Sequence, residues 1–361
     1  MTGSDLQRRA LALIGRGGDG VSTDQEFDDL ARSLFAFQFQ QCAPYRAHCV
    51  QQQRTPETVR HWQQIPAVPT SAFKDFALAS FPVAEAVAEF HTSGTTGART
   101  GRHYFPTLAL YQAALRPQFV DGLLPEPGRL RMLALVAAPA EAPHSSLSYM
   151  IGQVLDEFGA PTSAFYVHHD RLETDRLAQD LGKAQRAGQP VCLLGTALGF
   201  VHLFDGCARE SWQFELPEGS RAMETGGFKA RAQELSKPEL YRLFERYLGI
   251  PAARVVNEYG MTELSSQFYD ETLRIGRPTD CKRIPPWVRV LIVDPHTGQP
   301  APPNERGLIR IFDLANVWSL ACVQTEDLGV VDAAGRLIVH GRAAGAEARG
   351  CSLTAEAFVT S

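Results

Sequence analysis

A run of small hydroxyl residues and glycines carries the strongest chemical signal in the sequence. His91-Thr-Ser-Gly-Thr-Thr-Gly97 follows directly after the mostly apolar run Val87–Phe90. Glycines let a backbone approach a ligand closely and expose its N–H groups, and hydroxyls add donors, which suits a polyphosphate. No Gly-Lys-Ser/Thr follows, so this is not a Walker loop, and the nearest cations are Arg99 and Arg102. Clusters of Ser, Thr and Gly are also typical of ordinary polar turns, so both interpretations stay open.

A second motif follows another strand-like run. Asn257-Glu-Tyr-Gly-Met-Thr-Glu263 comes directly after Ala253–Val256. The ring of Tyr259 at the carboxyl end of a strand can cover a purine face, while a threonine hydroxyl and a carboxylate oxygen suit Mg²⁺. Upstream, Glu224-Thr-Gly-Gly-Phe228 ends a further strand with two glycines, against which a flat base can lie. Taken one at a time, Tyr259 is more typical of a core aromatic and Glu263 of a solvated charge.

A third group of polar residues lies near the carboxyl end of the sequence. Thr325-Glu-Asp-Leu-Gly329 is followed by Gly341-Arg342. A carboxylate such as Asp327 can accept both hydroxyls of a ribose, and an arginine such as Arg342 can pair with a phosphate through two N–H groups. A charged hairpin loop and a surface arginine account for the same residues when they are considered alone.

The elements that must position these residues alternate along the chain. The strand-like runs are 87–92, 130–137, 163–168, 190–195, 219–224 and 253–257, and the helix-like runs between them are 107–119, 145–158, 171–187, 196–205 and 236–248. This alternation predicts an α/β fold, with a mostly parallel sheet covered by helices on both faces. Short strand-like runs after residue 280 predict a small antiparallel β subdomain. The first 80 residues are predicted to be helical, with Thr23 and Glu26 as a capping box.

Composition and charge exclude several classes of protein. Of the 361 residues, 44% are apolar and 21% are charged, which is typical of a globular protein and excludes disordered and collagenous chains. The net charge of −5 argues against a nucleic-acid binder that neutralises many phosphates. The longest apolar run, 191–204, contains two glycines and a histidine and is too short to span a bilayer.

The cysteines and the N-terminus indicate a cytoplasmic protein. The seven cysteines are scattered and include no CxxC pair, so we expect reduced thiols rather than a disulfide framework. No quartet of His and Cys has the spacing of a zinc site. Residues 1–20 lack the apolar core of a signal peptide.

The order of the motifs resembles the adenylate-forming superfamily of acyl and aryl ligases, over about residues 87–342. The resemblance implies a large α/β domain with a β subdomain, and ATP and Mg²⁺ as cofactors. It assigns the ATP phosphates to Ser93, Gly94, Thr95, Thr96 and Gly97; adenine to Thr225, Gly226, Gly227 and Tyr259; phosphate and Mg²⁺ to Thr262 and Glu263; and ribose to Asp327. Thr262 and Arg342 are the catalytic residues that it implies in this region.

Two departures point to a narrower branch. Most members continue beyond the arginine into a C-terminal lid with a catalytic lysine, whereas this sequence ends at Ser361, and Ala98-Arg99-Thr100 lacks the usual lysine after the phosphate loop. The approach segment Ile65-Pro66 to Ser71-Ala-Phe-Lys74 and the ending Glu347-Ala-Arg-Gly-Cys-Ser-Leu353 are similar to the acyl-protein synthetases of bacterial bioluminescence systems, subunits of a fatty acid reductase. In that branch a cysteine near the C-terminus carries the acyl group, and Cys351 occupies its place.

The resemblance leads to four expected segments. Residues 1–82 form a helical segment packed on the main domain, 83–280 the α/β core that binds nucleotide and acyl group, 281–342 the β subdomain, and 343–361 a tail with Cys351. Family analogy places the acyl pocket near His144–Tyr149 and Gly195–Phe200, although the second stretch is more typical of an ordinary strand-to-helix turn.

The expected function is ATP-dependent activation of a carboxylic, and by resemblance fatty, acid as an acyl-adenylate. The acyl group then passes to a thiol, by resemblance that of Cys351, for hand-over to a partner such as a reductase. One alternative is an acyl- or aryl-CoA ligase. Another is a weakly catalytic nucleotide-binding scaffold subunit, which the expected absence of the lid supports.

Overall fold

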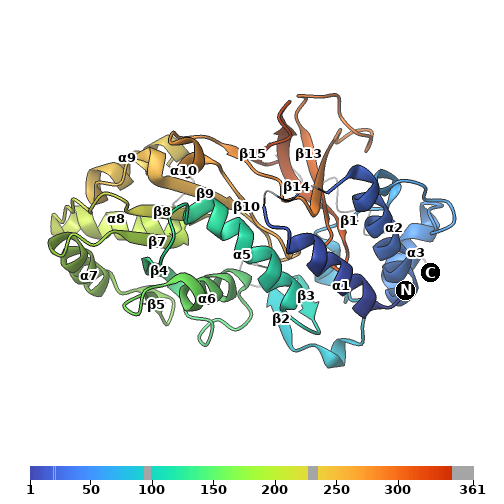
Figure 1. The fold of residues 1–361 in the computed structure, drawn as a ribbon, viewed down its shortest axis with the longest axis horizontal. Coiled ribbons are helices and arrows are strands. Elements are labelled where there is room, and N and C mark those ends of the chain that lie inside the picture. Colours follow the sequence, from blue (N-terminus) through green and yellow to red (C-terminus); the bar gives the residue numbers. More distant parts are fainter. Residues whose placement is uncertain (19, 21, 93–98, 227–234, 344–361) are drawn as a thin grey trace. The chain divides into compact units, whose positions relative to one another are not determined.

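The computed structural model describes the chain except residues 19, 21, 93–98, 227–234 and 344–361 (Figure 1). The contacts group the described residues into two units. The first unit contains residues 1–117, 261–267 and 282–343, and the second contains 118–260 and 268–281. The four segments expected from the sequence stay a prediction. Among the described helices, none combines the length and apolar character needed to cross a membrane.

The second unit is built on a seven-stranded sheet with the order β10-β9-β8-β7-β4-β5-β6. Neighbouring strands from β9 to β5 are parallel, whereas β10 and β6 pair antiparallel at the two edges. The strands are β4 (Arg131–Ala137), β5 (Ala164–His168), β6 (Arg171–Leu172), β7 (Val191–Thr196), β8 (Arg221–Thr225), β9 (Val255–Tyr259) and β10 (Phe268–Tyr269). Parallel strands buried on both faces have nearly continuous apolar sequences, as in Val191-Cys-Leu-Leu, and this explains why the sequence predicted them correctly.

Helices cover both faces of this sheet (Figure 1). They are α6 (Ser146–Phe158), α7 (Thr174–Arg186), α8 (Ala197–Glu210) and α9 (Lys237–Leu248), followed by the short η4 (Ala252–Arg254) and α10 (Thr272–Ile275). Apolar side chains of α7, α8 and α9 form one buried cluster with sheet residues such as Leu133 and Leu193. The buried side chains of α6 do not belong to that cluster, and Met150 of α6 accepts a hydrogen bond at its sulfur from the hydroxyl of Tyr269. The predicted α/β fold is confirmed.

The first unit contains the β subdomain, which is a sheet with the order β11-β15-β14-β13-β12. Its strands are β11 (Cys281–Lys282), β12 (Val288–Val293), β13 (Gly307–Asp313), β14 (Cys322–Val331) and β15 (Leu337–Arg342). β12 to β15 pair antiparallel, as the sequence predicted. A sixth strand, β1 (Val68–Pro69), joins parallel to β14. The prolines of this stretch indicated an extended chain, but its pairing with β14 was not predicted.

The N-terminal helices belong to the first unit. They are α1 (Gly3–Ile14), α2 (Asp24–Gln41), α3 (Ala43–Gln51) and α4 (Ala72–Asp75), with the short η1 (Trp62–Gln64) and η2 (Val83–Glu85), and α5 (Ala109–Leu123) contains the boundary between the units. The side chain of Thr23 accepts a hydrogen bond from the N–H of Glu26 at 3.1 Å, which confirms the predicted helix start.

The first of the predicted strands, 87–92, does not belong to the parallel sheet. The run 87–92 was expected within the alternating α/β pattern, but β2 (Ala88–His91) pairs antiparallel with β3 (Arg102–Phe105) as a separate two-stranded sheet of the first unit. The connection between the two strands is too short for a parallel crossover, which needs a dozen or more residues. The sequence analysis missed β3.

A buried carboxylate organises the segment Met261–Gln267, which has no regular secondary structure. Asp313, which is fully buried at the end of β13, accepts hydrogen bonds from the N–H groups of Ser265 (3.0 Å) and Ser266 (2.9 Å). It also accepts from the Ser266 hydroxyl (2.8 Å) and from the N–H of Ala315 (3.0 Å). Buried backbone donors outside helices and strands need such partners.

Replacing Asp313 is therefore expected to destabilise the protein strongly. Asp313→Ala leaves three backbone N–H groups and a hydroxyl without their acceptor, and we expect it to lower the free energy of unfolding by about 3 kcal/mol or more. Denaturant unfolding measures this change. Asp294→Ala is the matched control, because Asp294 accepts the N–H groups of His296 and Thr297 in an exposed turn. A loss for Asp313→Ala no larger than that of the control would contradict the assignment.

Candidate active site

The predicted phosphate loop connects β2 and β3. Ser93, Gly94, Thr95, Thr96 and Gly97 lie outside the described residues. The residues on either side of the loop are paired: the N–H of Thr92 donates to the carbonyl of Gly101 at 2.9 Å, and the N–H of Gly101 donates to the Thr92 hydroxyl at 2.8 Å. The two ends of the loop are therefore held together at the tip of a β-hairpin.

Thr262 contacts this hairpin at the end of β2, where the loop begins. Its hydroxyl donates to the carbonyl of His91 at 3.3 Å, across 171 positions of the sequence. Its own carbonyl accepts a hydrogen bond from Nδ1 of His103 on β3 at 2.8 Å. Burial lowers the pKa of His103 to about 4, so the ring is neutral, and we assign its proton to Nδ1 because a carbonyl can only accept. The first and second sequence motifs thus meet in the first unit.

Glu263 is buried rather than solvated, with only 6% of its surface exposed. Burial raises the pKa of its carboxyl group to about 7. The positive charge of Arg342 acts in the opposite direction, while the negative charges of Asp327 and Glu326 add to the increase. The backbone carbonyl of Glu263 accepts a hydrogen bond from Nδ2 of Asn316 at 2.8 Å. Considered in isolation, the sequence favoured a solvated charge here, and that interpretation is wrong.

Asp327 and Arg342 face each other on neighbouring strands. They are directly paired in the register of β14 and β15, and Arg342 Nε lies 3.9 Å from Asp327 Oδ1. The side chain of Asp327 is 20% exposed and that of Arg342 is 64% exposed, so both can reach a ligand. A charged hairpin loop, the alternative considered from the sequence, is wrong, because both residues lie within paired strands. The first unit therefore contains Thr262, Glu263, Asp327 and Arg342.

The residues predicted to hold adenine lie at the carboxyl ends of β8 and β9 in the second unit. The hydroxyl of Thr225, the last residue of β8, donates to the carboxylate of Glu258 on β9. Gly226 follows with a φ of 89°, a backbone conformation that favours glycine, and Gly227 lies outside the described residues. Tyr259 is half-buried and its ring lies 5.9 Å from that of Phe268, so it is not a fully buried core residue.

Sequence reasoning missed a buried polar network beneath these strand ends. One carboxylate oxygen of Glu224 accepts hydrogen bonds from Asn257 Nδ2 at 2.8 Å and from the Tyr241 hydroxyl at 3.2 Å. Glu224 and Asn257 are neighbours in the register of β8 and β9. The available signal was the position of each polar residue at the end of an apolar strand, since carboxyl ends of parallel strands meet at one sheet edge.

The suggested acyl pocket near Gly195–Phe200 is a packed turn. Thr196 caps α8 by accepting the N–H of Gly199 at 3.0 Å. A Cβ atom on Gly195 would lie 2.9 Å from the Cβ of Leu135, so the strand approaches its neighbour too closely for a side chain. This confirms the strand-to-helix turn that the sequence favoured.

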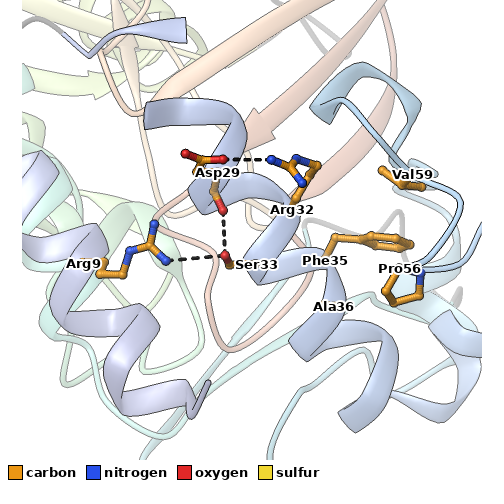
Figure 2. A pocket seen from close by; sticks show the side chains of 8 residues that line it. All are labelled: Arg9, Asp29, Arg32, Ser33, Phe35, Ala36, Pro56 and Val59. Carbon is orange, nitrogen blue, oxygen red and sulfur yellow. Dashed lines mark hydrogen bonds and ion pairs between the residues drawn. The ribbon is translucent and has the colours of Figure 1, made fainter. Parts of the chain in front are cut away.

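A cavity of about 400 Å³ lies in the first unit, beside α2, and Figure 2 shows the side chains that line it. Arg9 reaches Ser33 at 3.4 Å, and Arg32 pairs with Asp29 at 2.8 Å (Figure 2). The lining residues are Arg9, Asp29, Arg32, Ser33, Phe35, Ala36, Pro56 and Val59, and none of them was predicted as a site residue.

Comparison with solved structures identifies the fold. The fold is similar to that of 2-hydroxyisobutyryl-CoA ligase, solved in complex with 2-HIB-AMP and CoA, with a TM-score of 0.67 and 15% sequence identity. The match covers 91% of this chain and 70% of that chain. The fold is that of an adenylate-forming ligase.

Sequence comparison identifies the family. The chain is 23% identical over 308 residues to the long-chain-fatty-acid–luciferin-component ligase of Aliivibrio fischeri, covering 84% of this chain and 79% of that protein. It is 24% identical over 307 residues to the ligase of the same name from Vibrio harveyi, covering 84% and 78%. Residues 24–360 match the family described as acyl-protein synthetase, LuxE, and the chain belongs to that family. It is an acid–thiol ligase, and the resemblance inferred from its motifs is confirmed.

The buried carboxyl group of Glu263 predicts a pH dependence of stability. Its pKa is about 7 in the folded protein and near the model-peptide value of 4.5 in the unfolded chain, so folding takes up a proton between these values. Stability contributed by this group is therefore present below about pH 4.5 and is lost as the pH rises to about 7. Each pKa unit corresponds to about 1.4 kcal/mol, so the loss approaches roughly 3 kcal/mol.

Glu263→Gln removes this titration. The free energy of unfolding of the variant, relative to that of the wild type, should therefore be higher at pH 8 than at pH 4.5. The measurement is the difference in the free energy of unfolding between the two proteins across this pH range. Because His103 titrates in both, its opposite contribution cancels in the difference. A difference that does not change with pH would show that Glu263 is not titrating in this range.

Proposed function

We propose that this ligase activates a fatty acid with ATP as an acyl-adenylate, transfers the acyl group to the thiol of Cys351, and presents the thioester to a reductase partner. The observation that carries the proposal is the contact of Thr262 with His91, the residue of β2 directly before the start of the loop. This contact brings two motifs of the adenylate-forming ligases together. Asp327 and Arg342 lie in the same unit.

In the first step a carboxylate oxygen of the acid attacks the α-phosphorus of ATP. The bond from this phosphorus to the bridging oxygen breaks, and pyrophosphate leaves with its electron pair. Residues 93–97 would donate hydrogen bonds to the phosphates, and Arg342 would stabilise their negative charge. The hydroxyl of Thr262, which donates to the carbonyl of His91 in the structure, would have to release that carbonyl to donate to a phosphate oxygen. Asp327 would accept the ribose hydroxyls, and Thr225, Gly226, Gly227 and Tyr259 would hold adenine.

The surroundings of Glu263 fit a role as a Mg²⁺ ligand. Burial disfavours its charged form, and Asp327 and Glu326 disfavour it further. A bound divalent cation would instead favour the charged form of Glu263. Carboxylate oxygens are also ligands that Mg²⁺ prefers. When bound, Mg²⁺ supplies positive charge that stabilises the departing pyrophosphate.

In the second step the sulfur of a thiolate attacks the acyl carbonyl carbon, and the carbon–oxygen bond to AMP breaks. Cys351 lies outside the described residues, so its role rests on the family. Five of the six described cysteines are buried. Burial raises the pKa of Cys49 and Cys192 to about 12 and that of Cys207 to about 11, which disfavours the reactive thiolate. Arg349, two residues before Cys351, would favour it there.

The proposal also includes a substrate, a partner and a location in the cell. The two curated relatives are named as ligases for a long-chain fatty acid and a luciferin component, and this supports a fatty acid substrate. A reductase is the class of enzyme that consumes an activated acyl thioester in such systems. The proposal places the ligase in the cytoplasm, because a thiol carrier at Cys351 requires a compartment that keeps cysteines reduced.

The ribose role of Asp327 predicts weaker nucleotide binding after its removal. Asp327→Ala loses acceptors for two hydroxyls, and we expect ATP affinity to fall by about 1.5–3 kcal/mol, as for charge-assisted hydrogen bonds. Calorimetric titration with ATP measures the affinity. Asp332→Ala, in the turn that follows β14, is the control and should bind ATP as the wild type does. Unchanged affinity in folded Asp327→Ala would rule out the assignment.

Acylation of Cys351 is tested with labelled fatty acid and ATP. Without CoA, the wild type should acquire hydroxylamine-labile label, and Cys351→Ser should lose it while both retain carboxylate-dependent ATP–pyrophosphate exchange. Cys281→Ser is the control, since Cys281 is the partly exposed cysteine among those that the structure describes. Equal labelling of Cys351→Ser would place the carrier elsewhere. Turnover that requires CoA would favour a CoA ligase, and absent exchange would favour a scaffold.

A further inference from the structure

A buried asparagine contacts the backbone of the predicted metal ligand. Asn316 lies in the connection between β13 and β14 and is 1% exposed. Its Nδ2 donates to the carbonyl of Glu263 at 2.8 Å and to that of Leu320 at 3.2 Å. Its Oδ1 accepts from the Ser265 hydroxyl at 2.6 Å. Both polar atoms of the amide are engaged, so the side chain has one orientation that satisfies them.

The connection that carries Asn316 is itself held by the N-terminal helices. Gln38 of α2 is 2% exposed, and its Nε2 donates to the carbonyls of Asn316 (2.8 Å) and Val317 (3.3 Å). Its Oε1 accepts from the N–H of Ala321 at 3.1 Å. Trp318 of the same connection donates to Gln7 of α1 at 2.7 Å. Two helices therefore fix residues 316–321 through buried polar contacts.

The chemistry of these contacts suits a metal ligand. Gln38 and Asn316 are neutral amides, so they orient the backbone of Glu263 without adding a charge beside its carboxylate. The amides hold the backbone and leave the charge of Glu263 to be satisfied by a ligand.

We propose that Asn316, held by Gln38 of α2, is a positioning residue for Glu263 in the adenylation step. The N-terminal helices are then part of the catalytic apparatus rather than a cover over the β subdomain. This proposal rests on the proposed function, because it takes Glu263 as the Mg²⁺ ligand.

The test uses two variants of the full-length protein. Asn316→Leu removes all three hydrogen bonds of the side chain and keeps its branched shape. Gln38→Met removes the support of Asn316 and leaves Asn316 unchanged. Gln38→Met is the second variant that keeps the proposal testable if Asn316→Leu does not fold. Asp28→Ala is the matched control, because Asp28 is also buried on α2 but accepts from the N–H of Trp62 at 2.6 Å, away from residues 316–321.

Four quantities are measured: the melting temperature, the calorimetric Kd for Mg²⁺–ATP, the dependence of ATP–pyrophosphate exchange on Mg²⁺ concentration, and the KM for the fatty acid. We expect both test variants to raise the Kd and the half-saturating Mg²⁺ concentration by roughly 10-fold, the usual effect of losing a group that orients a metal ligand. The KM for the fatty acid should be unchanged. Asp28→Ala should lower the melting temperature and leave both Mg²⁺ quantities at the wild-type value.

The outcomes separate the two proposals. If the wild type exchanges pyrophosphate but Gln38→Met has the Mg²⁺ dependence of Asp28→Ala, Gln38 and Asn316 serve only stability and the inference is overturned while the proposed function stands. If the wild type shows no carboxylate-dependent exchange, the proposed function fails, and the inference fails with it.

Discussion

Residues 263–267 are buried in the first unit, and the segment 261–267 belongs to no helix or strand, so its polar groups must find partners among side chains. Asp313 accepts the N–H groups of Ser265 and Ser266, and Asn316 donates to the carbonyl of Glu263. His103 donates to the carbonyl of Thr262. Because an unpaired buried backbone group costs about 1–3 kcal/mol, these contacts determine the path of the segment. The position of Thr262 and Glu263 follows from that path.

The side chains that hold the backbone of Thr262 and Glu263 are neutral, whereas those that surround the Glu263 carboxyl group are charged. The groups that contact the Thr262 and Glu263 carbonyls, His103 and Asn316, are neutral, since burial keeps the imidazole unprotonated. The charges near Glu263 belong to Glu326 and Asp327 in the middle of β14 and to Arg342 at the end of β15, where Arg342 pairs with Asp327. A buried carboxylate with two acidic neighbours and one arginine carries an excess of negative charge. Protonation of Glu263 or a bound cation beside it would each reduce this excess of negative charge.

The match to a solved ligase at 15% identity has a physical explanation. A buried parallel sheet requires apolar strands and amphipathic helices but tolerates many residue choices, so the fold persists while the sequence changes. Polar side chains at the carboxyl ends of β8 and β9 are constrained more strongly, because each pairs with a specific neighbour, as Thr225 does with Glu258. The N-terminal helices contribute through equally specific contacts, such as that of Gln38 with residues 316–321.

The sequence by itself determined the elements and the motifs. Strands such as Val191–Thr196 and helices such as Lys237–Leu248 were predicted within a few residues, because continuous apolar runs and helical spacing are local properties. The start of α2 at Thr23 was predicted for the same reason, since a cap involves residues three positions apart. The order of the polar motifs indicated the family before any contact between them was known.

Only the tertiary structure decided which of these pieces meet. The pairing of β2 with β3, the contact of Thr262 with His91 and the burial of Glu263 depend on where distant segments lie. Gln38 and Asn316 are 278 positions apart, and nothing in either residue's surroundings in the sequence marks it as a partner of the other. A hydrogen bond between distant residues depends on the path of the whole chain, and the pKa of a carboxyl group depends on the groups that surround it after folding.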